Sequence, residues 1–100
     1  MLGVENGVSF VETISGTTPT ITGEPNVRYM CDEVSSISIT PPNAGTIDVV
    51  FTSGTTAALL TVPSTVKWPV WFDATTLETN TIYEILITDG IYGSVMTWAV

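Results

Sequence analysis

The chain has 100 residues, of which 10 are Asp or Glu and only 2 are Lys or Arg, so its formal net charge is -8 at pH 7. This length suits one compact domain, residues 1–100, with a single core. The negative charge would repel phosphate backbones and anionic headgroups, so we expect neither nucleic acid nor a membrane surface as a partner.

The predicted elements are all strands. Thr, Val and Ile make up 39 residues and Gln is absent, a composition that favours strands and leaves little material for a surface helix. Turn-forming residues recur at short intervals and separate eight strand-length segments. We therefore predict an all-β fold, either a β-sandwich or jelly-roll-like module of about eight short antiparallel strands, with a barrel as the alternative. The expected strands are 8–14, 20–22, 27–31, 36–40, 46–52, 57–62, 81–88 and 91–98.

The middle of the chain suggests a first hairpin. In segments 36–40 and 46–52, apolar side chains alternate with polar ones, so each strand should bury one face. Pro41 and Pro42 cannot donate ladder hydrogen bonds, so the chain must leave the sheet between them. We expect these two strands to pair through the Pro-Pro-Asn-Ala-Gly turn.

Segment 63–80 interrupts the rhythm of strands. It is predicted to be a long connection with one helical turn at 74–77, capped by Asp73. It also carries the main aromatic cluster, and aromatic rings suit both sugar binding and protein interfaces. The candidate interface or glycan-contact residues are Trp68, Trp71, Phe72, Tyr92 and Trp98. Packing in the core or at a subunit interface is the simpler use, and we expect Trp68 or Trp71 to be largely buried.

The last twenty residues predict a second hairpin. Asp89-Gly90 accepts positive φ in a two-residue type I′ turn between alternating segments 81–88 and 91–98. Gly93, expected opposite Leu86, should be a place where a backbone or bulky ring packs closely. The predicted register places Tyr92 opposite Ile87, Ser94 opposite Ile85 and Met96 opposite Tyr83.

Residue types argue against catalysis. Histidine is absent and Cys31 is alone, which removes Ser-His-Asp and Cys-His catalysis, the usual zinc ligand sets and any intramolecular disulfide. Asp32 and Glu33, with Asp48, could bind Ca²⁺, but no loop has the alternating acidic pattern of a calcium loop, and a solvated acidic face is the simpler interpretation. We predict no catalytic residue, metal ligand or cofactor. The chain is expected not to be an enzyme.

The sequence also predicts neither a signal peptide nor a membrane span. The opening MLGVENG lacks a basic region followed by an apolar one, and no apolar run approaches the roughly 20 residues that cross a bilayer.

Three strings carry a family resemblance: NVRYMCDEVSSISITPP at 26–42, IDVVFTSGTTAALLTVPSTVKWPVWFD at 47–73 and YEILITDGIYGSVMTW at 83–98. Together they resemble a small β module of predicted virion structural proteins, of the head-fibre, tail-fibre or minor structural type, from bacteriophages and prophages of gut Firmicutes. The resemblance implies a non-enzymatic structural or decorating role in the phage particle after synthesis in the bacterial cytoplasm. It also implies a homo-oligomer, with a trimer favoured, and contacts with other virion proteins. It transfers no site residue.

Two other functions remain open at this point. One is a glycan-binding module that presents Trp68 and Trp71 to a host-surface sugar, and the other is an acidic domain of a bacterial surface protein. An exposed, coplanar pair of tryptophans would favour glycan binding, whereas rings buried against the sheet or a sister subunit would favour the structural role.

Overall fold

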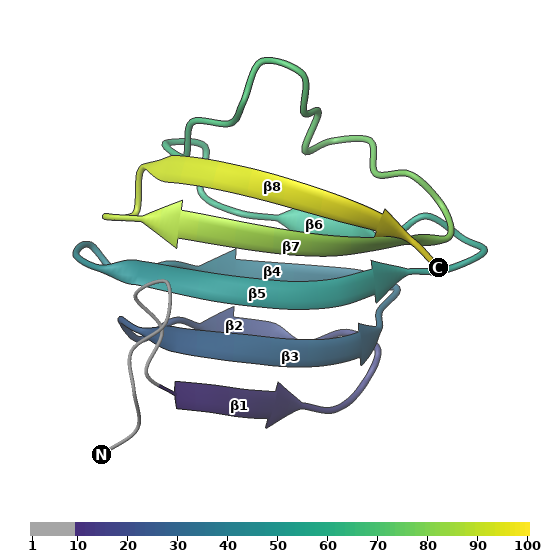
Figure 1. The fold of residues 1–100 in the computed structure, drawn as a ribbon, viewed down its shortest axis with the longest axis horizontal. Helices are drawn as coiled ribbons and strands as arrows, with labels where there is room; N and C mark the ends of the chain where they lie inside the picture. Colours follow the sequence, from purple (N-terminus) through teal and green to yellow (C-terminus); the bar gives the residue numbers. More distant parts are fainter. Residues whose placement is uncertain (1–9) are drawn as a thin grey trace.

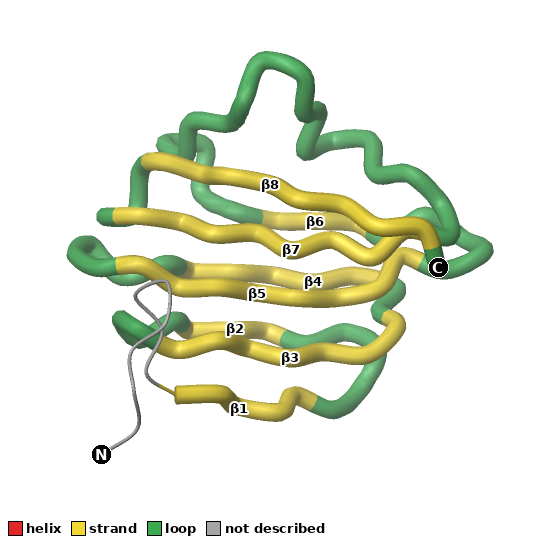
Figure 2. The backbone as a smooth tube through the Cα atoms, viewed as in Figure 1, coloured by secondary structure: helices red, strands yellow, loops and turns green. Residues whose placement is uncertain are grey.

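The computed structural model describes residues 10–100, and every regular element in that range is a strand (Figure 1; Figure 2). The predictions of an all-β chain and of eight strands are confirmed. Residues 8 and 9, which we assigned to the first strand, lie outside the described residues. The strands are β1 (Phe10–Ile14), β2 (Thr20–Thr22), β3 (Val27–Glu33), β4 (Ser36–Thr40), β5 (Thr46–Ser53), β6 (Leu59–Thr61), β7 (Thr81–Thr88) and β8 (Tyr92–Ala99).

The strands form two sheets, and the chain alternates between them from β1 to β6. The large sheet has the order β1-β3-β5-β7-β8 and the small sheet has the order β2-β4-β6, and in Figure 1 the small sheet lies behind the large one. As a result β1, β3 and β5 pair in parallel, as do β2, β4 and β6, and only β5–β7 and β7–β8 are antiparallel.

The predicted antiparallel arrangement is therefore wrong for most of the strand pairs, and the pairing is not that of a jelly roll. Parallel neighbours need a crossover connection. Here a strand of the opposite sheet serves as each crossover, which a pattern of strands and turns does not reveal.

The predicted hairpin between 36–40 and 46–52 is also wrong, because β4 and β5 belong to different sheets. Pro41 and Pro42 do end the pairing of β4, as expected, but the chain then crosses to the other sheet instead of turning back. Alternation identified the buried side chains correctly: Ile37 and Ile39 of β4 and Val49 of β5 are all buried. It could not say in which sheet they lie.

The core lies between the two sheets. Its fully buried members include Val49 and Phe51 of β5 and Ile85 of β7, and the small sheet contributes Ile37 and Ile39. Cys31 also joins this core as a free thiol. Burial, followed by the negative charge of Asp32, raises the Cys31 pKa to about 11, so the thiol is protonated and unreactive at neutral pH.

The final hairpin turns where the sequence predicts, but its register differs by one residue. Asp89 and Gly90 both have positive φ, and the Ile91 N–H donates to the Thr88 carbonyl at 3.0 Å. Ile91 is then left out of the ladder, so that Tyr92 pairs with Thr88. The other pairs now include Gly93 opposite Ile87, Val95 opposite Ile85 and Thr97 opposite Tyr83.

A shift of one residue exchanges the two faces of a strand. The positions of Gly93 and Val95 therefore share a face with the core residues Ile87 and Ile85. A neighbouring segment explains the extra residue, because the Lys67 N–H donates to the Ile91 carbonyl at 2.6 Å and the Gly93 N–H donates to the Lys67 carbonyl at 2.8 Å.

Gly90→Val should disturb this hairpin. The φ of Gly90 is 67°, and an added Cβ would lie 3.0 Å from the Pro42 carbonyl oxygen. We expect a loss of about 1–2 kcal/mol or more in the free energy of unfolding, measured by urea denaturation. Gly16→Val is the matched control. Gly16 also has a positive φ, 95°, but no atom lies within 4 Å of its added Cβ, so this variant shows the cost of the backbone conformation without the contact. A Gly90→Val chain as stable as wild type would contradict the turn.

Candidate functional site

The connection between β6 and β7 forms one wall of a groove. We call residues 62–80 the arch, because in Figure 1 they rise beyond β8 and return to β7. No helical turn forms at 74–77, so that prediction is wrong. Asp73 closes a single tight turn instead: its Oδ1 accepts the Thr75 N–H at 2.9 Å and the Thr75 hydroxyl, and its carbonyl accepts the Thr76 N–H at 3.3 Å.

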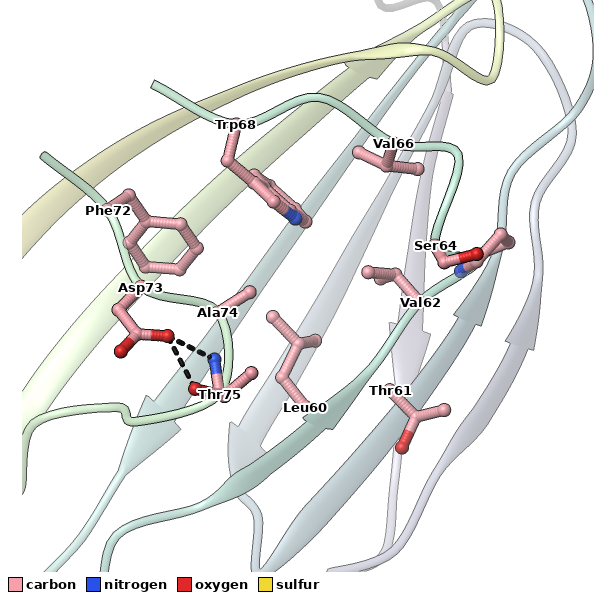
Figure 3. A pocket seen from close by; sticks show the side chains of 11 residues that line it. Leu60, Thr61, Val62, Ser64, Val66, Trp68, Phe72, Asp73, Ala74 and Thr75 are labelled. Carbon is pink, nitrogen blue, oxygen red and sulfur yellow. Dashed lines mark hydrogen bonds between the residues drawn. The ribbon is translucent and has the colours of Figure 1, made fainter. Parts of the chain in front are cut away.

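A groove of about 580 Å³ lies between the arch and β6. In Figure 3 the side chains of Trp68, Phe72, Leu60 and Val62 point toward this space from the two sides. The lining residues are Leu60, Thr61, Val62, Pro63, Ser64, Val66, Trp68, Phe72, Asp73, Ala74 and Thr75. The walls are mainly apolar, with hydroxyl groups and one carboxylate among them.

Trp68 is held against the last strand. A Cβ added to Gly93 would lie 2.6 Å from the Trp68 ring, so the indole packs directly on the backbone of β8. The expectation that a bulky ring packs closely at Gly93 is confirmed, although Gly93 lies opposite Ile87 and not Leu86. Trp68 is partly buried and packs against the core. A larger residue at position 93 would displace the ring that forms one wall of the groove.

Phe72 connects the aromatic side chains of the arch to the core. Its ring meets those of Trp68, Trp71 and Tyr83 edge-on, with centroids 5.1, 5.7 and 6.1 Å away. Tyr83 in turn stacks on Phe51 at 5.5 Å. Trp71, at the outer end of this series, is 62% exposed. Trp68 and Trp71 are therefore not an exposed pair, because Trp68 is partly buried against the core while Trp71 is mainly exposed.

The remaining two candidate residues lie on the other side of β8. Because Gly93 and Val95 face the core, the side chains of Tyr92 and Trp98 turn outward, where they are 60% and 48% exposed. The structure thus brings Trp68, Trp71 and Phe72 together in the arch and separates them from Tyr92 and Trp98. The five residues do not form one platform.

A group of charged side chains lies on the outer face of the large sheet. Arg28 is directly opposite Asp48, and its Nε donates to the Asp48 Oδ2 at 2.7 Å, while its Nη2 lies 3.5 Å from the Glu84 Oε2. Asp48 is only 1% exposed. Its Oδ1 is buried and has no donor in the described part of the chain while both carboxyl groups are ionised.

This arrangement favours the protonated form of Glu84. A hydrogen bond with Asp48, then burial and then the Asp48 charge raise the Glu84 pKa to about 7, and Arg28 only partly opposes them. A protonated Glu84 has a hydroxyl that can donate to the Asp48 carboxylate. The neighbouring carboxylate and the burial of Glu84 therefore favour the protonated form of Glu84. Because Asp48 is buried and already bound by Arg28, this group is suited to holding strands together more than to meeting a substrate.

The sequence matches no family model, and neither curated proteins nor solved structures include one that is significantly similar to it. Within residues 10–100, no helix is long and apolar enough to cross a membrane. In the same range no three His, Cys, Asp or Glu side chains come together in a way that could hold a metal ion.

Sequence reasoning missed the Arg28–Asp48–Glu84 group. We expected Asp48 on a solvated face, and it does point away from the core, but it is buried there by its surroundings. The signal in the sequence was the scarcity of cations. Arg28 is one of only two, and it lies in a predicted strand that is close in sequence to several carboxylates, so an ion pair could be expected. Finding the pair required knowing that β3 and β5 are neighbours.

Proposed function

We propose that the chain is a non-enzymatic structural or decorating module of a phage virion that assembles with itself or docks on a capsid or tail. The observation that carries the proposal is the exposure of large apolar side chains on a chain of charge -8. One set lies on the outer face of β8, namely Tyr92, Met96 and Trp98, and another lies on the arch, namely Val70 and Trp71. Contiguous exposed apolar residues mark interaction surfaces.

The edge of the large sheet adds support. β8 is an outer strand of eight residues without a single charge, and Lys67 pairs with it only at Tyr92. Edge strands of this kind pair readily with other chains unless charge, proline or a covering segment prevents it. The resemblance to fibre and minor structural proteins of phages points to the same use. In this proposal, Asp48 and Glu84 have a structural and not a catalytic role.

Glycan binding is the second candidate, and the groove is the observation that favours it. Trp68 and Phe72 form aromatic walls beside the Asp73 carboxylate and the hydroxyl groups of Ser64 and Thr75. The Thr75 hydroxyl, followed by the Thr75 N–H, lowers the Asp73 pKa, so this carboxylate stays ionised and can accept sugar hydroxyls. The proposal ranks below assembly because Trp68 is partly buried, so that Trp68 and Trp71 do not form an exposed pair.

Light scattering over a concentration series tests the assembly proposal. We expect a homo-oligomer at micromolar concentration and ordinary salt, with the mass of a trimer as the resemblance implies. A stable monomer at high micromolar concentration would contradict self-assembly. A glycan array with the same protein serves as the control and should stay at background; a specific sugar signal from a monomeric chain would favour the second candidate.

A further inference from the structure

The top of the arch is apolar and exposed. We call residues 69–71 the arch tip; in it, Val70 is fully exposed and Trp71 is 62% exposed, next to Pro69. Within residues 10–100, Phe72 is the aromatic neighbour of the Trp71 ring. Tryptophan side chains that project in this way are typical of residues that anchor protein interfaces.

The groove lies on the same arch, next to the tip. Its walls include Leu60, Val62, Trp68 and Phe72, and its volume of about 580 Å³ is within the range of sites that bind organic ligands. Asp73 is the one ionisable residue of its lining, and the Asp73 Oδ1 already accepts two hydrogen bonds from Thr75. An apolar side chain can therefore enter without leaving a buried charge unpaired.

The distribution of charge favours a second copy of this chain as the occupant. Residues 62–77 contain one cation, Lys67, and one anion, Asp73, so this part of the arch is neutral. The net charge of -8 belongs to the rest of the chain. Two copies that meet at this part of their arches bring together surfaces without net charge, whereas contacts through the carboxylate-bearing surfaces would oppose like charges.

We propose that the arch tip of one copy inserts Val70 and Trp71 into the groove of a second copy. The inference rests on the proposed self-assembly and names its contact. Tip and groove are different surfaces of one chain, so two copies can exchange tips reciprocally about a two-fold axis, or several copies can join head-to-tail in a closed ring; either arrangement leaves no tip exposed. A ring of three copies fills every groove with a tip and agrees with the expected trimer.

Two variants separate the tip from the groove. Trp71→Ser removes the anchor and keeps the groove, whereas Ala74→Trp fills the groove and keeps the tip. Each variant alone should associate at least 10-fold more weakly than wild type in sedimentation or light scattering. An equimolar mixture should recover complexes, because the tip of the Ala74→Trp chain fits the open groove of the Trp71→Ser chain.

A control variant, a substitute variant and a check of folding complete the test. Leu59→Ser removes an exposed apolar side chain of β6 that does not line the groove, so association should equal that of wild type. Ser64→Trp fills the groove from its opposite side and replaces Ala74→Trp if that chain does not fold. Thermal unfolding and circular dichroism verify that each variant keeps the fold.

The outcomes distinguish this inference from the broader proposal. If wild type assembles and both variants assemble equally well, the tip-in-groove contact is wrong and self-assembly stands. If both variants dissociate but their mixture stays monomeric, the contact is likewise overturned, because the tips then meet some other surface. A wild-type chain that is monomeric at every concentration refutes both, and sugar binding in its groove would replace them.

Discussion

Trp68→Ala is expected to lower the free energy of unfolding by about 3 kcal/mol, the lower end of the range for aromatic residues in a core. Trp68 is only partly buried, but its ring fills the space against Gly93 and packs on Phe72. Trp71→Ala should cost less than about 1 kcal/mol, because Trp71 is mainly exposed. Urea denaturation of the two variants beside wild type provides the comparison.

Gly93→Ala provides a sharper control for the role of Trp68. In wild type the added Cβ would meet the Trp68 ring at 2.6 Å, so overpacking should destabilise the chain by about 1–3 kcal/mol. In the Trp68→Ala background the same substitution should cost almost nothing, so the two effects are not additive. Equal costs in both backgrounds, or a Trp68→Ala chain as stable as wild type, would show that the ring does not pack as described.

The second large effect is a dependence of stability on pH that comes from Glu84. The carboxyl pKa is about 7 in the folded chain, against a usual value of 4.5, so the folded chain holds the proton more tightly. The stabilising contribution is complete below about pH 4.5 and is lost as the pH rises through about 7. The sign follows from the raised pKa: protonation stabilises the folded chain, and deprotonation of Glu84 removes that stabilisation.

Glu84→Gln should remove this dependence. The amide stays neutral and can donate to the Asp48 Oδ1, so above pH 7 the variant should be more stable than wild type, and near pH 4.5 the two should be similar. Unfolding curves at several pH values give the comparison. Glu12→Gln makes the same change of charge at an exposed position in β1 and should follow the wild-type profile. If the stability of wild type and of Glu84→Gln changed with pH in the same way, the raised pKa of Glu84 would be excluded.

The sequence was sufficient for the local features of this fold. β-branched composition and turn residues located the strands, and β2, β4 and β7 have the predicted limits. Positive φ at Asp89 and Gly90 followed from the residue types alone. Each of these features depends on residues that are close together in the chain, so it can be predicted from the sequence.

The pairing of strands was not predictable in the same way. The alternation of apolar and polar residues in β4 and β5 showed which apolar side chains are buried. A strand has the same alternation whether the next strand pairs with it in one sheet or lies opposite it in the other sheet. The register of β8 failed for a related reason. Lys67, from a distant segment, holds Ile91 outside the ladder, and no local pattern announces that contact.

The candidate site shows the same division. Sequence reasoning identified Trp68, Trp71 and Phe72 as a group because they are close in the chain, and the structure keeps them together. It added Tyr92 and Trp98 to the same surface by residue type alone, whereas the observed register turns both side chains to the outer face of β8. The groove itself depends on β6 lying opposite the arch, which is a property of the small sheet and not of the aromatic segment.

The alternation of the chain between two sheets also determines when the protein can fold during its synthesis. β5 is the centre of the large sheet, yet its partner β7 begins only at Thr81, nearly thirty residues after β5 ends. A nascent chain that has left the ribosome as far as β6 therefore exposes one edge of β5. Its many carboxylates then matter before the fold exists, because like charges oppose contact between unfinished chains on neighbouring ribosomes.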